Sequence, residues 1–335
     1  MNKVVLAIFT VVIVAGCSSA QAQKLNIKSD TSWCNKTVML EEAGKLNEAL
    51  AVCEQATKLE PKNADAWYNT GVLLGKMGEY QKALDAYNKT LEINPKAKWA
   101  WLNKGEILGQ LGKGEEGLIC YDEAIKIDPD FAFAWYNESV GLYQLGKAKE
   151  SLEAVDKALK IDPTQAGFWY NKGRILLDLN RLDEALAASE QAAKLDPSNT
   201  MAWKCQAVIY MKQKKWQNAI DAFDKILKLN ADDDEILSHK GGCLYALRKY
   251  QEALEVLDKS LGVNPKNADA WYNRSCTYSL LKEKEKALSD LNQAIKLDND
   301  SKERSKKDKD FQWLWDDEEF KKLPGSGDSI PNPNK

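Results

Sequence analysis

The sequence has few of the residues that build metal sites and many catalytic sites. It contains one histidine, His239, in 335 residues, so no histidine pair can bind a metal ion. No two of its seven cysteines have the two-residue separation that is typical of zinc and redox sites. We find no set of base, nucleophile and metal ligands in the sequence. We therefore expect neither catalysis nor a metal ion nor a cofactor.

The sequence also lacks an excess of one charge. Its 47 Lys and Arg residues nearly balance its 50 Asp and Glu residues, which gives a formal net charge of −3. The two signs are mixed along the chain rather than separated into blocks. A basic surface is the usual mark of a nucleic-acid-binding protein, so we expect no nucleic acid partner. We expect no small-molecule substrate either.

One apolar stretch without charges lies near the N-terminus. It runs from Val4 to Gly16 after Lys3, and it is too short for a permanent membrane helix but has the length of a signal-peptide core. The segment 14–17 that ends in Cys17 resembles a lipobox, the motif of prokaryotic lipoproteins in which the cysteine is lipidated. Residues 1–17 are then a signal peptide and residues 18–29 a polar tether. The alternative is cleavage after Ala22, which would release a soluble exported protein.

The other six cysteines fall at different positions of the 34-residue sequence repeat that is described below. This spread favours small buried thiols over disulfides. The one pairing that deserves a test is Cys34 with Cys53, because both lie in the same repeat.

A unit of 34 residues recurs eight times between residues 30 and 301 without an insertion or a deletion. The most visible column consists of tryptophan at seven of its eight positions: Trp33, Trp67, Trp101, Trp135, Trp169, Trp203, Leu237 and Trp271. Small residues follow four positions later, and mostly leucine three positions after that. This spacing of four and then three residues predicts one buried stripe of a helix.

A second helix is predicted in each unit by another column of small residues: Ala49, Ala83, Gly117, Ser151, Ala185, Ala219, Ala253 and Ala287. Small residues in this column allow two helices to approach closely. Six of the nine prolines then fall just beyond this helix, where proline ends it. Each unit is therefore predicted to be a helical hairpin.

These columns resemble those of tetratricopeptide repeat proteins, which share the period and the order of tryptophan, small, leucine, alanine, aromatic and proline positions. The resemblance implies an all-α, right-handed superhelical solenoid with the first helices on its concave side. It implies one domain of eight repeats, at 30–63, 64–97, 98–131, 132–165, 166–199, 200–233, 234–267 and 268–301. Residues 302–323 resemble the capping helix of such arrays, and residues 324–335 are expected to form a disordered tail.

A column two residues after the tryptophans is rich in asparagine: Asn35, Asn69, Asn103, Asn137, Asn171, Cys205, His239 and Asn273. On a helical wheel this column lies about 200° from the tryptophans, so we expect its side chains to reach solvent. It resembles the asparagine ladder of O-linked N-acetylglucosamine transferases, in which amides bind the backbone of an extended polypeptide. The alternatives are shared descent of the repeats and amide bonds between neighbouring repeats.

Tyrosines lie beside the asparagines and are expected to be partly exposed on the same face, at Tyr68, Tyr136, Tyr170 and Tyr272. The predicted peptide-binding site combines these tyrosines with Asn69, Asn103, Asn137, Asn171 and Asn273, and adds Arg174 and His239.

The sequence thus predicts a scaffold without catalytic activity that binds protein or peptide segments in a concave groove. We expect it to be exported and anchored in the cell envelope by a lipid on Cys17. One alternative is an assembly factor that uses the convex surface or the repeat ends. Another is a soluble adaptor, secreted or cytoplasmic.

Overall fold

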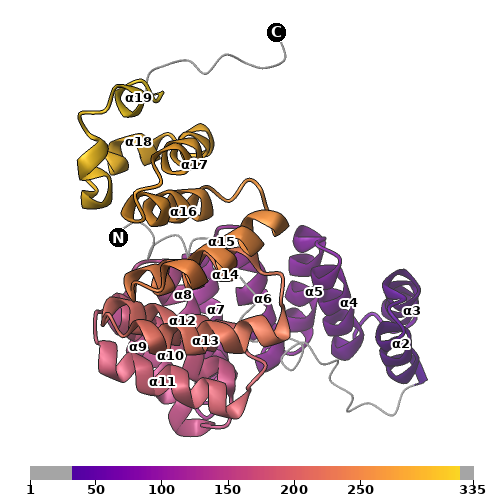
Figure 1. Cartoon of the computed structure of the whole chain (residues 1–335). Helices are drawn as coiled ribbons and strands as arrows, with labels where there is room; N and C mark the ends of the chain where they lie inside the picture. The colour runs from indigo at the N-terminus through magenta and orange to yellow at the C-terminus, as the bar shows by residue number, and fades with distance from the viewer. Residues whose placement is uncertain (1–31, 325–335) are drawn as a thin grey trace. The chain divides into compact units, whose positions relative to one another are not determined.

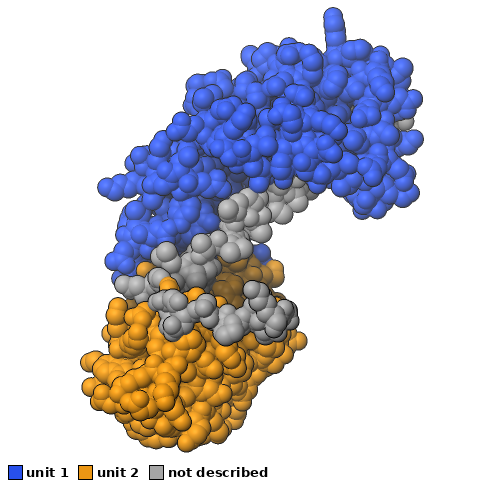
Figure 2. Space-filling model, turned by 90° about the horizontal axis from the view of Figure 1, so that it is seen from above, with its two compact units in different colours: residues 1–196 blue, residues 197–335 orange. Residues whose placement is uncertain are grey.

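The computed structural model describes residues 32–324. The predicted signal peptide, the lipidation site at Cys17, the tether and residues 325–335 of the tail lie outside this range. The chain divides into two compact units, residues 1–196 and residues 197–335, which are coloured separately in Figure 2. Each unit is described by itself below.

The described part of the first unit consists of five helical hairpins (Figure 1). Their helices are α2 (Ser32–Glu42), α3 (Leu46–Leu59), α4 (Ala64–Lys76), α5 (Tyr80–Ile93), α6 (Lys98–Gln110), α7 (Gly114–Ile127), α8 (Ala132–Gln144), α9 (Ala148–Ile161), α10 (Ala166–Asp178) and α11 (Leu182–Leu195). Each hairpin packs against the next one in the sequence.

The second unit contains three more hairpins and a short C-terminal segment. Its helices are α12 (Thr200–Lys212), α13 (Trp216–Leu229), α14 (Asp234–Ala246), α15 (Tyr250–Val263), α16 (Ala268–Leu280), α17 (Lys284–Leu297), α18 (Asp300–Ser305), the 3₁₀ helix η1 (Lys309–Leu314) and α19 (Glu318–Lys321). From α4 onward, every first helix begins 34 residues after the previous one. The predicted all-α fold of tandem helical hairpins is confirmed.

Small residues hold the two helices of each hairpin together. The predicted column on the second helices is buried throughout, with 0 % exposure at its six alanines and at Ser151. The facing column on the first helices is equally tight, because a Cβ atom added at Gly71 would lie 2.6 Å from the ring of Tyr87. This close approach explains why large side chains do not occur in either column.

The turn inside each hairpin requires a left-handed backbone at one residue. Glycine occupies this position in the first four hairpins, from Gly44 to Gly146 at intervals of 34 residues. The next four hairpins have Asn180, Lys214, Arg248 and Lys282 there, with φ between 57° and 63°. A side chain in this conformation costs about 1 kcal/mol or more, so the last four turns are strained relative to the first four.

The tryptophan column marks the start of the first helices but is not fully buried. In six repeats the indole Nε1 donates a hydrogen bond of 2.8–3.0 Å to the carbonyl oxygen of the proline six residues earlier. These tryptophans are half-buried. Each one therefore joins a first helix to the proline that ends the preceding repeat.

Residues 300–323 pack against the last hairpin. Phe311, Leu314 and Phe320 are buried in one apolar cluster with Leu288 and Leu291 of α17. The segment thereby covers the apolar flank that the end of a repeat array leaves open.

The single domain of eight repeats stays a prediction beside these two units. In a solenoid each repeat contacts only its neighbours, so no common core joins distant repeats. The division falls between Asp196 and Pro197, at the boundary of the fifth and sixth repeats within three residues.

Candidate functional site

The prediction that the asparagine column faces solvent is wrong for most of its members, and only Asn35 is exposed. Asn69, Asn103 and Asn171 are each only 2 % exposed. The side-chain nitrogen of Asn103 donates a hydrogen bond of 3.1 Å to the Tyr68 hydroxyl, and that of Asn171 donates one of 2.9 Å to the Ser139 hydroxyl. Both bonds join the first helices of neighbouring repeats. These two amides therefore stabilise the stack. This is the alternative of amide bonds between neighbouring repeats.

Four other members of the column are half-buried or buried. Asn137 and Asn273 are half-buried, whereas Cys205 and His239 are buried at 0 % and 7 % exposure. The His239 ring stacks on Phe223 with the centroids 6.0 Å apart and the planes at 18°. This packing contradicts the predicted role of His239 in ligand contact.

The tyrosines of the predicted site are buried as well, so their expected partial exposure is wrong. Tyr68, Tyr136, Tyr170 and Tyr272 are between 1 % and 6 % exposed. The Tyr136 ring stacks on Phe168 of the next first helix, with the centroids 4.6 Å apart. These rings fill the space between first helices.

The error has a simple geometric cause. A helical wheel drawn for one hairpin assigns a single buried side to the first helix, which is the side facing its own second helix. In the stack, neighbouring first helices also contact one another, as α4 does with α6 and α14 with α16. Two or three sides of each first helix are therefore buried.

A narrow stripe of each first helix is formed by the second, fifth, ninth and twelfth residues of a repeat. These positions are three, four and three residues apart and so share one helix face. The second, ninth and twelfth residues are half-buried in several repeats, whereas the fifth residue is buried at every described position except Lys204. In the first unit the stripe includes the half-buried Trp99 and Phe133 at the second position, Arg174 at the ninth and Tyr143 at the twelfth. We call this surface the first-helix stripe.

Arg174 is the strongest polar feature of the stripe in the first unit. Its guanidinium carbon lies 4.2 Å from the centroid of the Tyr143 ring, and one terminal nitrogen donates a hydrogen bond of 3.2 Å to the Asn171 side-chain oxygen. Among the described residues, the Nε of Arg174 has no acceptor. A guanidinium carries five N–H donors, and because the Nε of Arg174 is buried, a carboxylate would be met by the terminal nitrogens.

The hydroxyl of Tyr143 illustrates how this stripe binds a carboxylate. It donates a hydrogen bond to Asp178 at the end of the next first helix. Burial and the neighbouring Asp178 raise the pKa of Tyr143, so the hydroxyl keeps its proton and acts as a donor.

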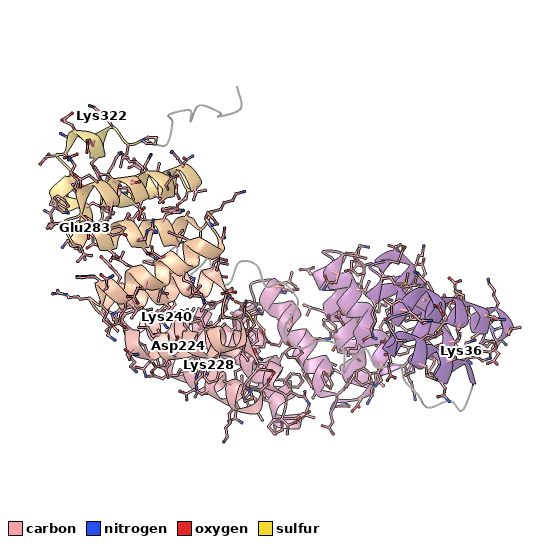
Figure 3. The ribbon with its side chains drawn as sticks, turned by 45° about the vertical axis from the view of Figure 1, so that its right-hand side comes forward. Lys36, Asp224, Lys228, Lys240, Glu283 and Lys322 are labelled. Carbon is pink, nitrogen blue, oxygen red and sulfur yellow. The ribbon has the colours of Figure 1, made fainter. Side chains whose placement is uncertain are left out.

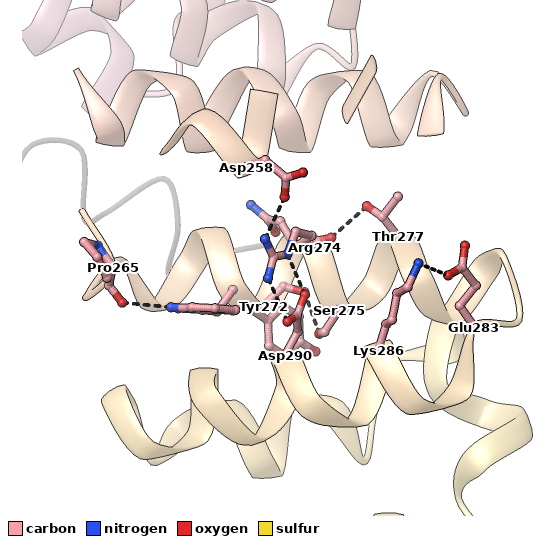
Figure 4. A network of polar contacts seen from close by, with 11 residues as sticks. Asp258, Pro265, Tyr272, Arg274, Ser275, Thr277, Glu283, Lys286 and Asp290 are labelled. Carbon is pink, nitrogen blue, oxygen red and sulfur yellow. Dashed lines mark hydrogen bonds and ion pairs between the residues drawn. The ribbon is translucent and has the colours of Figure 1, made fainter. Parts of the chain in front are cut away.

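A second electrostatic pattern joins the seventh residue of a repeat to the second helix of the preceding repeat. It comprises the ion pairs Lys172–Asp156 at 2.7 Å, Lys240–Asp224 at 2.6 Å and Arg274–Asp258 at 2.6 Å. Figure 3 labels Lys240 and Asp224, and Figure 4 shows Arg274 between Asp258 and Asp290. The sequence analysis missed this pattern, although it is visible as a column of basic residues facing a column of aspartates.

One junction reverses the pattern. Glu138 occupies the seventh position of the fourth repeat, opposite Asp122. Burial, followed by the repulsion from Asp122, raises the pKa of Glu138 against the opposing effect of Lys157. Among the described residues, its Oε2 atom is buried without a hydrogen-bond partner.

Models of the tetratricopeptide repeat family match the chain at residues 40–78, 64–97, 100–131, 132–165, 169–234, 210–273 and 268–301. Together the matches cover every repeat from the second to the eighth, in the register that the helices follow. The chain is a tetratricopeptide repeat (TPR) protein.

Solved structures with the same fold come from several sources. PilF of Pseudomonas aeruginosa is 22 % identical, with a TM-score of 0.54 over 66 % of this chain and 97 % of that one. The Cut9–Hcn1 complex contains a chain that is 17 % identical, with a TM-score of 0.54 over 89 % of this chain and 56 % of that one. A TPR protein of Parabacteroides merdae is 17 % identical, with a TM-score of 0.53 over 77 % and 99 %. Among curated proteins, no sequence matches the chain.

The other sequence candidates have structural roles in this TPR protein. Cys53, Cys120, Cys205, Cys243 and Cys276 are buried, as predicted, and burial raises the pKa of the Cys120 thiol to about 11. The side chain of Cys34 lies outside the described part. Among the described residues, no helix has both the length and the apolar composition needed to span a bilayer.

Proposed function

We propose that this TPR protein is a scaffold without catalytic activity that binds extended protein segments on the first-helix stripe. The TPR fold is a protein-interaction module, and its repeated first helices offer the same face several times in succession. The observation that carries the proposal is the half-buried Arg174 guanidinium, which lies over the Tyr143 ring and donates one hydrogen bond to Asn171. The amide column no longer belongs to the proposed contact surface.

The chemistry of the stripe favours partners that carry carboxylates and aromatic side chains. Arg174 is a hydrogen-bond donor, and Trp99 and Phe133 present half-buried rings 6.0 Å apart. An arginine next to aromatic rings is the composition found in the parts of interfaces that contribute most binding energy.

The test is to capture partners from an envelope extract with purified wild type and with Arg174→Ala. Arg181→Ala is the matched control, because Arg181 lies in the same repeat and forms an exposed ion pair with Glu184. We expect Arg174→Ala to reduce the recovered partner at least tenfold, as the loss of about 1.5–3 kcal/mol from a charged hydrogen bond predicts. Equal recovery with all three proteins would contradict the proposal.

We further propose that the protein is exported and anchored by a lipid on Cys17. Support comes from the apolar stretch 4–16 and the cysteine directly after it. Mass spectrometry of the mature N-terminus distinguishes the alternatives. A lipidated Cys17 would support the anchor, while a chain that starts at Gln23 or retains Met1 would refute it.

A further inference from the structure

The chain's own C-terminal segment lies on the first-helix stripe of the last repeat. Residues 308–313 run along α16, and they contact Tyr272, Cys276 and Ser279, which are the fifth, ninth and twelfth residues of that repeat. Just before this segment, Arg304 lies 3.8 Å from the Tyr272 ring centroid and pairs with Asp269, the second residue. All four positions of the stripe are thus in use.

Two aspartates of the segment make the main polar contacts. The Tyr272 hydroxyl donates a hydrogen bond of 3.0 Å to Asp308, and the Cys276 thiol lies 3.9 Å from the same oxygen. The Tyr245 hydroxyl, at the twelfth position of the preceding repeat, donates to Asp310. Two neighbouring repeats therefore each bind one carboxylate of the segment.

Aromatic side chains of the segment complete the contact. Phe311 is fully buried, and its ring centroid lies 5.9 Å from that of Tyr272. The Trp313 indole donates a hydrogen bond of 2.8 Å to the Ser279 hydroxyl, which itself donates to the Asp310 carbonyl oxygen at 2.6 Å. Lys282 lies over the Trp313 ring at 4.5 Å.

A cap for the end of the array needs only apolar cover, and Phe311, Leu314 and Phe320 supply that cover. In addition, Asp308 and Asp310 accept hydrogen bonds from tyrosine hydroxyls, as Asp178 does from Tyr143 between α8 and α10. Withdrawing a carboxylate from water is costly, and burial raises the pKa of Asp310 above its usual range. The specific donors that meet Asp308 and Asp310 compensate for this cost, which is what a recognition site does.

The same positions recur in the first unit. Tyr143 and Tyr245 are 102 residues apart, or three repeats of 34, and each donates its hydroxyl to a carboxylate. Tyr68, Tyr136 and Tyr170 stand at the position of Tyr272 in their own repeats. The contacts of residues 308–313, most of which belong to the 3₁₀ helix η1, thus show how the stripe of the last repeat binds a short helical segment.

We infer that the stripe formed by Tyr245, Tyr272 and Ser279 is a binding site for partner segments with the pattern Asp-x-Asp-aromatic-x-Trp, and that residues 308–313 occupy it as an internal ligand. A partner segment of this chemistry competes with the chain's own segment. The inference deepens the proposed function and rests on it, because it names the class of segment that the stripe recognises.

The test cuts the chain so that the C-terminal segment becomes a separate polypeptide. A specific protease site is inserted between Lys306 and Lys307, which are both exposed, in the otherwise complete chain. After cleavage the C-terminal segment is held only by its contacts, and a synthetic peptide of residues 306–316 is added as competitor. Mass spectrometry of gel-filtration fractions measures the released segment, and far-UV circular dichroism measures the helix content of the repeats.

We expect the peptide to release the segment while the helix content of the repeats stays constant. A peptide with asparagine at positions 308 and 310 should need at least a tenfold higher concentration, because it loses two charged hydrogen-bond acceptors. A peptide that keeps Asp308, Asp310, Phe311 and Trp313 but changes the other residues should compete like the original. The double variant Tyr245→Phe and Tyr272→Phe should remove the difference between the aspartate and asparagine peptides.

Three results would overturn the inference. In the first, the aspartate and asparagine peptides compete equally well. In the second, the repeats lose helix content when the segment is released. In the third, no peptide displaces the segment. These experiments need no natural partner, so they can succeed even if Arg174→Ala leaves partner capture unchanged. In that case the proposed use of the first unit would fail, while the binding site in the second unit would stand.

Discussion

At the residue scale, one glutamate interrupts a series of ion pairs between repeats. Lys172, Lys240 and Arg274 each bind an aspartate of the preceding repeat, whereas Glu138 meets Asp122 at the equivalent position. Nothing in the fold requires an acid there, since the backbone register is the same at all these junctions.

Glu138→Lys should therefore stabilise the protein. The substitution removes a buried carboxylate oxygen without a partner and the repulsion from Asp122, and these two effects together outweigh the lost attraction to Lys157, for a gain of about 1 kcal/mol. The midpoint of urea unfolding measures the effect. Glu153→Lys, on the exposed side of α9 in the same repeat, is the control and should change the stability by less than about 0.5 kcal/mol. A Glu138→Lys protein no more stable than wild type would show that Asp122 does not repel this position.

The pH dependence of stability gives a second test of Glu138. Because its pKa is raised in the folded protein, the native state binds more protons than the unfolded state between the ordinary pKa of glutamate and the raised value. The stability of the wild type thus falls as the pH rises through this window. We expect Glu138→Gln to be more stable than wild type at pH 7, and the difference to disappear below about pH 4. A difference that is constant with pH would contradict the assignment.

The left-handed turns offer a further test at single residues. Lys214→Gly removes the Cβ strain at φ 57° and should raise the free energy of unfolding by about 0.5–1 kcal/mol. Lys225→Gly, at an exposed position inside α13, should lower it by about 1 kcal/mol, because glycine is a poor helix former. Urea unfolding of both variants checks the opposite signs. Two destabilised variants would mean that the turn does not strain Lys214.

At the element scale, the hairpins could be predicted from the sequence and the exposure of their faces could not. The tryptophan, small-residue and proline columns fixed where helices begin, approach and end, and α4 to α17 follow that register. The asparagine and tyrosine columns were misjudged because neighbouring first helices bury them, as the bond from Asn103 to Tyr68 shows. Burial between repeats depends on how the hairpins stack, which the pattern within one repeat does not contain.

The C-terminal segment was recognised from its aromatic residues, but its path across α16 was not. That path depends on hydrogen bonds from Tyr245, Tyr272 and Ser279, which lie 29 or more residues before Asp308 in the sequence. A pattern of apolar residues predicts that a segment packs, and it does not predict which face of a helix the polar atoms reach.

Phe311→Ala should destabilise the second unit by about 3–5 kcal/mol, because the side chain is fully buried in the cluster with Leu291 and Phe320. Gln312→Ala, at the exposed neighbouring position, is the control and should have almost no effect. Limited proteolysis followed by mass spectrometry measures the change as faster cleavage between residues 300 and 324. Equal cleavage rates in the two variants would show that Phe311 does not fasten the segment.

At the scale of the whole molecule, the proposed function depends on the repetition of one helical face. Each repeat presents the same stripe positions, and each varies the side chains there, from Trp99 and Phe133 to Arg174. A solenoid can therefore bind an extended segment through several modest contacts that act together. The mixed charge of the chain fits this role, since no single sign dominates the surface.

The central claim is that partners bind the first-helix stripe, and site-specific photocrosslinking tests it most directly. A benzophenone amino acid replaces Phe133 on the stripe in one protein and Ile119, which is 62 % exposed on the second helix α7, in another. After irradiation in the envelope extract, we expect a crosslinked partner at position 133 that is lost when Arg174→Ala is added, and none at position 119. Crosslinks at position 119 alone, or equal crosslinks at both positions, would contradict the account.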